Sequence, residues 1–212
     1  MTLADAFREA TQAAFALSFD RLAAVPDLPR MGAAALAIVL LAGLSEAAGE
    51  SVVLFVNRVR PPRFVLSLLV SALIFTFTYL FLAGSVYAVV RLLIGPEVPL
   101  LTVTVTVGVA HAPRMLGFLA FLPYFGQPLA LALYGWSVLA LLVGVRATMD
   151  ATLLQALAAV ALGAMLLAVL QRTVGRPFAY VAQRVRWLTA GVRLATPQEA
   201  VEQLLDDEGA TG

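Results

Sequence analysis

Four ionisable side chains fall inside long apolar stretches of the sequence, where they could do chemistry at membrane depth. Glu46 and Glu50 are four residues apart and so share one helix face, while His111 and Arg114 follow in a later stretch. Two carboxylates and an imidazole could relay protons or ions through a helix bundle. Arg114, however, keeps its charge and needs an anionic partner, for which Glu46 or Glu50 is the obvious candidate.

The structural interpretation of these four residues is the one we favour. In it, a carboxylate and Arg114 neutralise each other and fix how their helices pack, or the side chains reach water from near the segment ends. A transport pathway usually offers more polar residues than this chain has. Pro113, beside His111 and Arg114, is expected to bend or interrupt its segment because proline lacks the N–H that a continuing helix needs.

Cofactor and metal chemistry has few possible ligands here. His111 is the only histidine and cysteine is absent. Haem sites in bundles often use a second histidine or a methionine, and Glu46, Glu50 and His111 follow no metal-site spacing. We therefore predict no cofactor and no metal site, with haem or chlorophyll on His111 as a less favoured alternative.

Sequence motifs of catalysis are also missing. The chain has no phosphate-binding GxxxxGK loop, no GxGxxG after a strand, no HExxH and no GxSxG. We predict that the protein is not an enzyme, and no soluble small-molecule substrate is indicated. The net charge of +1 argues against nucleic acid as a partner, because nucleic-acid binding usually needs a strong basic excess.

Composition indicates which elements must position these residues. Hydrophobic residues make up 61% of the 212-residue chain and charged residues 13%, whereas soluble domains are about half apolar and about a quarter charged. Apolar stretches of about 20 residues, enough to cross the hydrocarbon layer as helices, recur along the chain. The predicted fold class is an all-α integral membrane protein with a five-helix transmembrane bundle and interfacial amphipathic helices at both ends. The predicted segments are 31–56, 64–94, 98–122, 128–145 and 151–170.

One of these segments has an ambiguous pattern. Residues 102–108 alternate valine and threonine, which in a soluble protein would favour a strand. In lipid, an isolated strand leaves its backbone polar groups without partners, so we predict a helix.

Residues 1–30 form the predicted N-terminal division of the chain. An apolar stripe at helical spacing predicts an amphipathic helix over about 1–25, either lying at the membrane interface or packed on the protein's own membrane domain. Pro26 and Pro29 end it. Charged residues precede any long apolar run, which is unlike a cleavable signal peptide. The residues that recur at this spacing are Leu3, Phe7, Ala10, Ala14 and Leu17, and Arg21 continues the same line.

Residues 173–212 form the predicted C-terminal division, after the membrane domain at 31–172. Its basic and aromatic residues predict an interfacial segment that faces anionic lipid or a partner, and an acidic end follows. Thr196 and Glu199, a capping box, begin a short helix. The lipid- or partner-facing basic residues begin at the end of the membrane domain and are Arg172, Arg176, Arg184, Arg186 and Arg193.

Arginine placement favours a cytoplasmic C-terminus if five segments cross the membrane. Eight arginines then lie inside: Arg58, Arg60, Arg63, Arg172, Arg176, Arg184, Arg186 and Arg193. Five lie outside: Arg8, Arg21, Arg30, Arg91 and Arg146.

A set of short motifs resembles the Yip1 domain family over roughly residues 31–172. They are Ala110-His111-Ala112-Pro113, Leu116, Leu122-Pro123-Tyr124-Phe125-Gly126, Gly135-Trp136-Ser137 and Val143-Gly144-Val145-Arg146. The resemblance implies five spans, no catalytic residues and a cytoplasmic N-terminus, which conflicts with the arginine count. Eukaryotic members associate with small GTPases in vesicle traffic, a role that we do not transfer to a bacterial relative. We expect a bacterial inner membrane, either cytoplasmic or of the intracytoplasmic or thylakoid type.

These observations together predict a non-catalytic membrane protein that organises, or is an accessory subunit of, a larger membrane complex. The predicted partners are the lipid bilayer and other membrane protein subunits. Two alternatives remain. One is a small proton-coupled transporter that uses Glu46, Glu50, His111 and Arg114, and the other is a pigment- or haem-binding subunit that uses His111.

Overall fold

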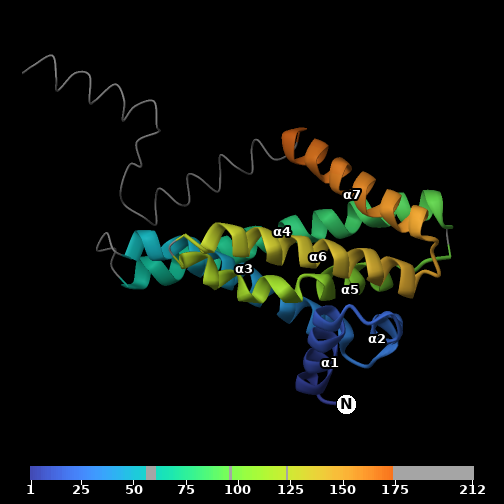
Figure 1. Cartoon of the computed structure of the whole chain (residues 1–212), viewed down its shortest axis with the longest axis horizontal. Coiled ribbons are helices and arrows are strands. Elements are labelled where there is room, and N and C mark those ends of the chain that lie inside the picture. The colour runs from blue at the N-terminus through green and yellow to red at the C-terminus, as the bar shows by residue number, and fades with distance from the viewer. Residues whose placement is uncertain (56–60, 96, 123, 174–212) are drawn as a thin grey trace, which may run out of the picture.

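The computed structural model describes residues 1–55, 61–95, 97–122 and 124–173, apart from the side chains of 50–55, 61–64, 67 and 173. Within these ranges all regular structure is helical, as the sequence predicts (Figure 1). The elements in chain order are α1 (Leu3–Ala16), α2 (Phe19–Ala24), η1 (Val25–Asp27), α3 (Met31–Phe55), α4 (Pro61–Leu93), α5 (Leu100–Ala110), η2 (Ala112–Phe121), α6 (Gly126–Thr148) and α7 (Leu153–Thr173).

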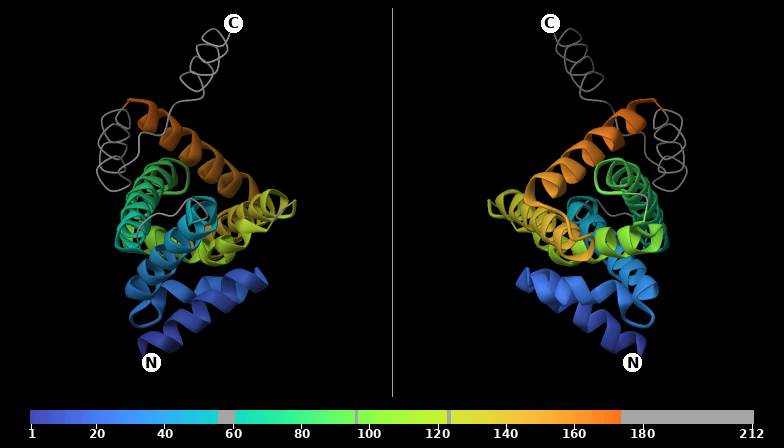
Figure 2. Two further views of the ribbon diagram at one scale, coloured as in Figure 1. Left: turned by 90° about the vertical axis from the view of Figure 1, so that its left-hand side faces the viewer. Right: turned by 90° about the vertical axis from the view of Figure 1, so that its right-hand side faces the viewer.

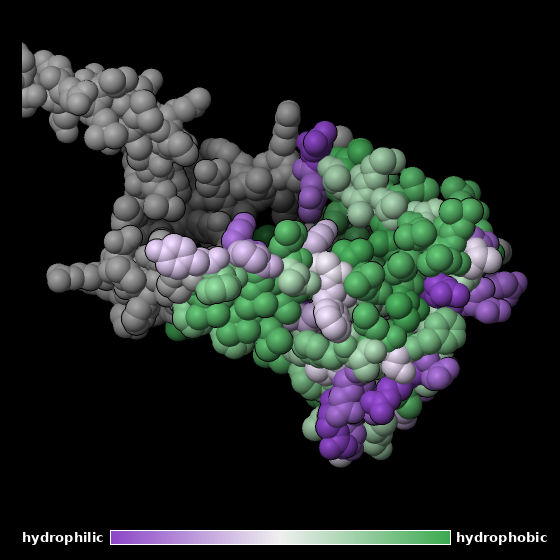
Figure 3. All heavy atoms as spheres, viewed as in Figure 1, coloured by the Kyte–Doolittle hydropathy of each residue, from purple (hydrophilic) through white to green (hydrophobic). Residues whose placement is uncertain are grey.

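In the described part of the chain, five stretches are long and apolar enough to cross a membrane, which confirms the number of predicted segments. They are Met31–Gly49, Leu68–Leu93, Leu100–Phe121, Gly126–Thr148 and Leu153–Arg172. The visible surface over the long helices is largely hydrophobic, whereas hydrophilic residues gather over α1 and α2 (Figure 3). This distribution is the one expected of a helix bundle whose sides face lipid.

The centre of the bundle is α5, the helix with the valine–threonine alternation. Its residues from Val105 to Ala110 are all buried, because α3, α4 and α6 pack around it. Thr104 and Thr106 donate their hydroxyls to the carbonyl oxygens of Leu100 and Thr102, both at 2.8 Å. The polar side chains are thus satisfied within their own helix, and the helical prediction for this stretch is confirmed.

The third span breaks where proline was expected to interrupt it. The α-helix ends at Ala110, and the chain continues from Ala112 to Phe121 as a 3₁₀ helix with Pro113 in its first turn. A 3₁₀ stretch of this length is uncommon, because its hydrogen bonds have poorer geometry than those of an α-helix. The segment lies along α3, which supplies side-chain partners described below.

The N-terminal region differs from the single helix predicted over 1–25. It forms two helices, because Leu17 adopts a left-handed conformation with φ 49° that ends α1. Four alanines of α1 are fully buried against α3 and η2: Ala6, Ala10, Ala13 and Ala14. The alternative in which this region packs on the protein's own bundle is therefore the one that the structure displays, with α1 and α2 on one flank (Figure 2).

Helix α7, the last within the described ranges, lies on the side of the bundle away from α1 (Figure 2). It packs on α4, where a Cβ added at Gly163 would lie 3.1 Å from the Cα of Val86, and Ala156 and Ala159 in its first half are fully buried. Its second half diverges from the other helices (Figure 1). Only 17% of its most apolar stretch is buried, the lowest value of the five spans.

Candidate functional site

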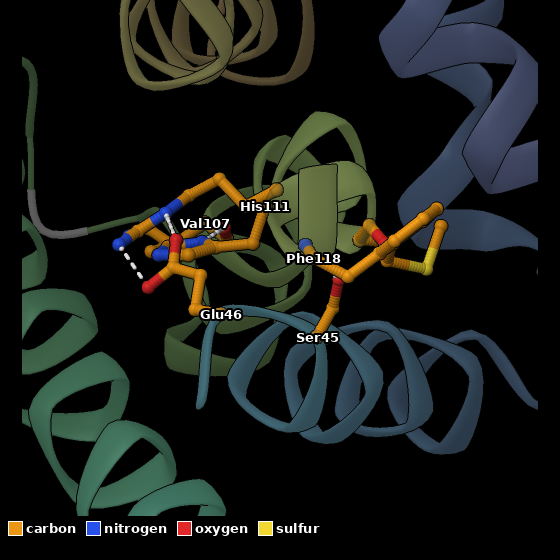
Figure 4. A network of polar contacts seen from close by, with 7 residues as sticks. Ser45, Glu46, Val107, His111 and Phe118 are labelled. Carbon is orange, nitrogen blue, oxygen red and sulfur yellow. Dashed lines mark hydrogen bonds and ion pairs between the residues drawn. The ribbon is translucent and has the colours of Figure 1, made fainter. Parts of the chain in front are cut away.

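A charged pair joins α3 to η2 at the break in the third span. Arg114 donates from Nε to Oε1 of Glu46 at 2.5 Å and from Nη2 to Oε2 at 2.9 Å, which is a two-point contact (Figure 4). The Arg114 guanidinium also lies over the rings of Phe75, at 4.7 Å from the centroid, and Tyr134, at 5.6 Å. Of the two carboxylates proposed from the sequence, Glu46 is the one that the structure places against Arg114. Glu50 belongs to α3, but its side chain lies outside the described residues.

Ser45, the residue before Glu46, ties the same two elements together. Its hydroxyl donates to the carbonyl oxygen of Met115 at 2.7 Å and accepts from the backbone N–H of Phe118 at 2.8 Å (Figure 4). Backbone groups released by a broken membrane helix need partners from neighbouring helices, because hydrocarbon provides none. Ser45 therefore stabilises the 3₁₀ conformation of η2.

Glycine allows the backbones of α3 and η2 to approach closely. A Cβ added at Gly117 would lie 2.7 Å from Cγ of Glu46, and one added at Gly49 would lie 2.6 Å from the carbonyl oxygen of Gly117. Side chains larger than hydrogen would push the two elements apart. This close approach brings the short side chain of Ser45 and the carboxylate of Glu46 within reach of η2.

His111 occupies the junction between α5 and η2. Its Nδ1 donates to the carbonyl oxygen of Val107 at 2.7 Å (Figure 4). The rings of Phe75 and Tyr79 meet its imidazole edge-on. Tyr79 donates its hydroxyl to the carbonyl oxygen of Thr104 at 2.9 Å. With Nδ1 as donor, the neutral imidazole keeps Nε2 as its hydrogen-bond acceptor.

A cavity of about 510 Å³ lies beside these residues. Three of the four ionisable residues singled out in the sequence, Glu46, His111 and Arg114, line it, and most of its surface is apolar. Its lining includes Glu46 from α3, Tyr79 from α4, His111, Arg114 from η2, Ser137 from α6 and Ala164 from α7.

Ser137 is the unusual member of this lining. Its side chain is buried, with 7% of the residue exposed, and its hydroxyl has no hydrogen-bond partner among the described residues. Leaving a buried hydroxyl without a partner costs about 1–3 kcal/mol. Ser85 on α4 is equally buried and unpartnered, but it does not line the cavity.

No group of three or more metal-ligating side chains occurs within the described ranges. The haem or chlorophyll alternative on His111 stays a prediction that an absorption spectrum of the purified protein tests. Of the basic C-terminal residues, Arg172 is exposed in the last turn of α7, whereas Arg176, Arg184, Arg186 and Arg193 lie outside the described residues.

Sequence reasoning missed the aromatic and hydroxyl residues of the site. Helical spacing in the sequence could have indicated two of them, because Phe75 and Tyr79 are four residues apart and therefore share one face of α4. Nothing in the sequence says that Ser137 faces the same cavity as His111, because that depends on how α6 is rotated in the bundle.

No protein-family model, no curated protein and no solved structure matches this chain. The resemblance to the Yip1 domain family therefore stays a prediction from the short motifs around α5, η2 and α6.

Proposed function

We propose that the protein is a non-catalytic multi-pass membrane protein that organises, or is an accessory subunit of, a larger membrane complex. In this proposal it is a bacterial inner-membrane protein of the Yip1 type, whose partners are other membrane subunits and the bilayer. The polar groups at its centre then hold the fold, and the exposed helix faces make the functional contacts.

The observation that carries this proposal is that the central polar groups bind each other. Glu46 pairs with Arg114, Ser45 satisfies the backbone of η2, and His111 donates to Val107. A carboxylate held by two hydrogen bonds to a guanidinium is better suited to fixing helices than to releasing protons. The least buried span, α7, leaves a long apolar face for a neighbour.

Purification of the tagged full chain from native membranes in mild detergent tests this proposal. We expect a partner at constant stoichiometry on native gels, also recovered after cross-linking in intact membranes. The control is a tagged, unrelated multi-pass protein expressed at the same level, which should not retain that partner. A chain that runs alone under both treatments would contradict the proposal.

Proton-coupled transport is the second candidate, and the cavity is the observation that favours it. Glu46, His111 and Arg114 all line this space, so a solute there would meet a carboxylate, an imidazole and a guanidinium. A transporter needs such groups to face a pathway.

Proton uptake by proteoliposomes tests the second candidate. If transport is the function, Glu46→Gln should abolish solute-dependent uptake, whereas Glu9→Gln, on α1 and outside the cavity lining, should leave it unchanged. Equal uptake by both variants would exclude a role for Glu46 in coupling.

A further inference from the structure

The cavity next to the Glu46–Arg114 pair has the construction of a ligand site. Its volume of about 510 Å³ lies in the range of small-molecule pockets, about 300–1,000 Å³. Its charged side chains and His111 lie at the break in the third span, and its wall on α7 is apolar from Val160 to Ala168. Further polar side chains line it elsewhere, namely Ser71 and Thr78 on α4 and Gln171 at the end of α7. A molecule that fills it must therefore be amphiphilic, with a polar head at the break and an apolar part along the helices.

The charges at the polar end cancel within the protein. Arg114 makes a two-point contact with Glu46 and stacks on two aromatic rings, so its positive charge is already compensated. An anionic or cationic head group would have to break this pair or remain without a counter-ion in a low-dielectric site. The site thus favours an uncharged head group.

Two side chains at the cavity can each form a hydrogen bond with a ligand hydroxyl. Ser137 has a buried hydroxyl without a partner in the part of the chain that the structure describes, and it can turn about χ1 to meet a ligand. The neutral imidazole of His111, with Nδ1 bound to Val107, offers Nε2 as an acceptor. A ligand hydroxyl can donate to Nε2 of His111 while it accepts from Ser137.

We propose that this cavity binds an uncharged, hydroxyl-bearing amphiphile from the bilayer, with its head group between Ser137 and His111 and its apolar part against α7. Acylglycerols and isoprenoid quinols share this chemistry. The proposal goes beyond the accessory role and does not depend on it, because binding is measured on the isolated full chain.

Photo-labelling of the purified chain in phosphatidylcholine vesicles tests the proposal. Three diazirine probes are compared: a diacylglycerol, an isoprenoid quinol and, as a charged probe, phosphatidic acid with the same acyl chains. We expect at least one uncharged probe to label peptides of α6 and α7 at the cavity, while phosphatidic acid labels only lipid-facing positions. The diacylglycerol and quinol arms distinguish the two sources of the ligand.

Matched variants locate the binding. Loss of one hydrogen bond in Ser137→Ala should lower cavity labelling about fivefold, whereas Ser85→Ala, which removes the other unpartnered hydroxyl, should leave it unchanged. Ala164→Phe places a ring in the cavity and should abolish labelling there, whereas Ala161→Phe, on an exposed part of α7 outside the cavity, should not.

Three results would overturn the proposal. One is equal labelling of the cavity by phosphatidic acid and the uncharged probes. Another is cavity labelling that Ser137→Ala does not lower although Ala164→Phe does, because the site would then be an apolar groove without head-group recognition. The third is labelling by all probes at lipid-facing positions alone.

Discussion

The contact between Glu46 and Arg114 owes its form to the low dielectric around it. Taking two charges out of water is costly, and the cost is met only when the geometry is good and the remaining donors are used. Arg114 meets the first condition with its two hydrogen bonds to the carboxylate, and its guanidinium also lies over the rings of Phe75 and Tyr134. Removing one partner leaves the other charge uncompensated, whereas removing both does not.

We predict that Arg114→Gln lowers the free energy of unfolding by about 2–4 kcal/mol, because Glu46 is left charged at membrane depth. The value is toward the low end for buried pairs, since the Arg114 and Glu46 side chains are 21% and 29% exposed. The double variant Glu46→Gln/Arg114→Gln should lose less free energy of unfolding than Arg114→Gln alone. Chemical denaturation in detergent micelles, analysed as a double-mutant cycle, measures the coupling.

The control for this cycle is Arg8→Gln. Arg8 lies 3.8 Å from Asp5 in a pair whose side chains are 72% and 46% exposed, so its loss should change stability by less than about 0.5 kcal/mol. Similar losses of unfolding free energy in Arg8→Gln and Arg114→Gln would show that the Glu46–Arg114 pair stabilises the protein no more than an exposed surface pair.

Sequence reasoning at this scale could name Arg114 and its need for an anion, but it could not choose between the two glutamates. Glu46 and Glu50 share a helix face, so both fit the charge argument. The choice depends on how far η2 slides along α3, and that offset follows from Ser45 and Gly117, which carry no charge.

Among the elements, the close packing of η2 on α3 is what places the candidate site. The contact requires small residues, because a Cβ added at Gly49 or Gly117 would lie less than 3 Å from an atom of the facing element. The proline that breaks the span was visible in the sequence. The partner that satisfies the broken backbone was not, since a serine in an apolar helix is equally consistent with many orientations.

We predict that Gly117→Ala destabilises the protein by about 1–3 kcal/mol, because its Cβ would meet Glu46 at both Cγ and backbone and force the helices apart. Gly135→Ala on α6 is the matched control. An added Cβ there meets nothing within 4 Å, so the change should stabilise the helix by about 0.5–1 kcal/mol. Thermal unfolding of both variants in micelles measures the difference, and equal effects would refute close packing at Gly117.

The start of α1 carries a pH-sensitive cap. Hydrogen bonds from the backbone and side chain of Thr2 hold the pKa of the exposed Asp5 carboxyl below its usual value of 3.8. The pKa of Asp5 is lower in the folded protein than in the unfolded chain. The cap therefore stabilises α1 fully above pH 3.8, and this stabilisation is lost as the pH falls through the folded pKa.

We therefore predict that amides of the first turn of α1 lose exchange protection on acidification in this range. Asp5→Asn should give lower protection that no longer changes with pH there. Peptide-resolved hydrogen exchange over residues 1–16, corrected for intrinsic rates, measures both. Loss of protection with the same pH profile in Asp5→Asn would assign the effect to another group.

Across the whole molecule, the succession of five apolar helices was readable from the sequence because each is long and bounded by proline, glycine or charge. The division of the N-terminal region was not, because the turn at Leu17 and Ser18 contains neither glycine nor proline. The cavity also escaped prediction, because it depends on the angle at which α7 leaves α4, and periodicity carries no information on angles.

Single cysteines should report the topology, since the chain has none of its own. Five crossings predict that Glu97→Cys and Asp150→Cys react with an impermeant maleimide from one side of oriented vesicles and Tyr124→Cys from the other. Tyr124→Cys on the cytoplasmic side would agree with the arginine count, and on the opposite side with the Yip1 resemblance. Labelling of all three from one side would contradict five crossings.

The place of α7 after the other four described spans has a consequence for biosynthesis. An insertion intermediate that holds only the first four helices lacks one wall of the cavity, so Ser137 and the pair at Arg114 are open to the surrounding lipid on that side. Insertion of α7 then supplies the remaining wall beside any molecule that has entered from the bilayer. Because the ribosome delivers the helices in chain order, a hydrophobic ligand has its widest access to the cavity before α7 is inserted.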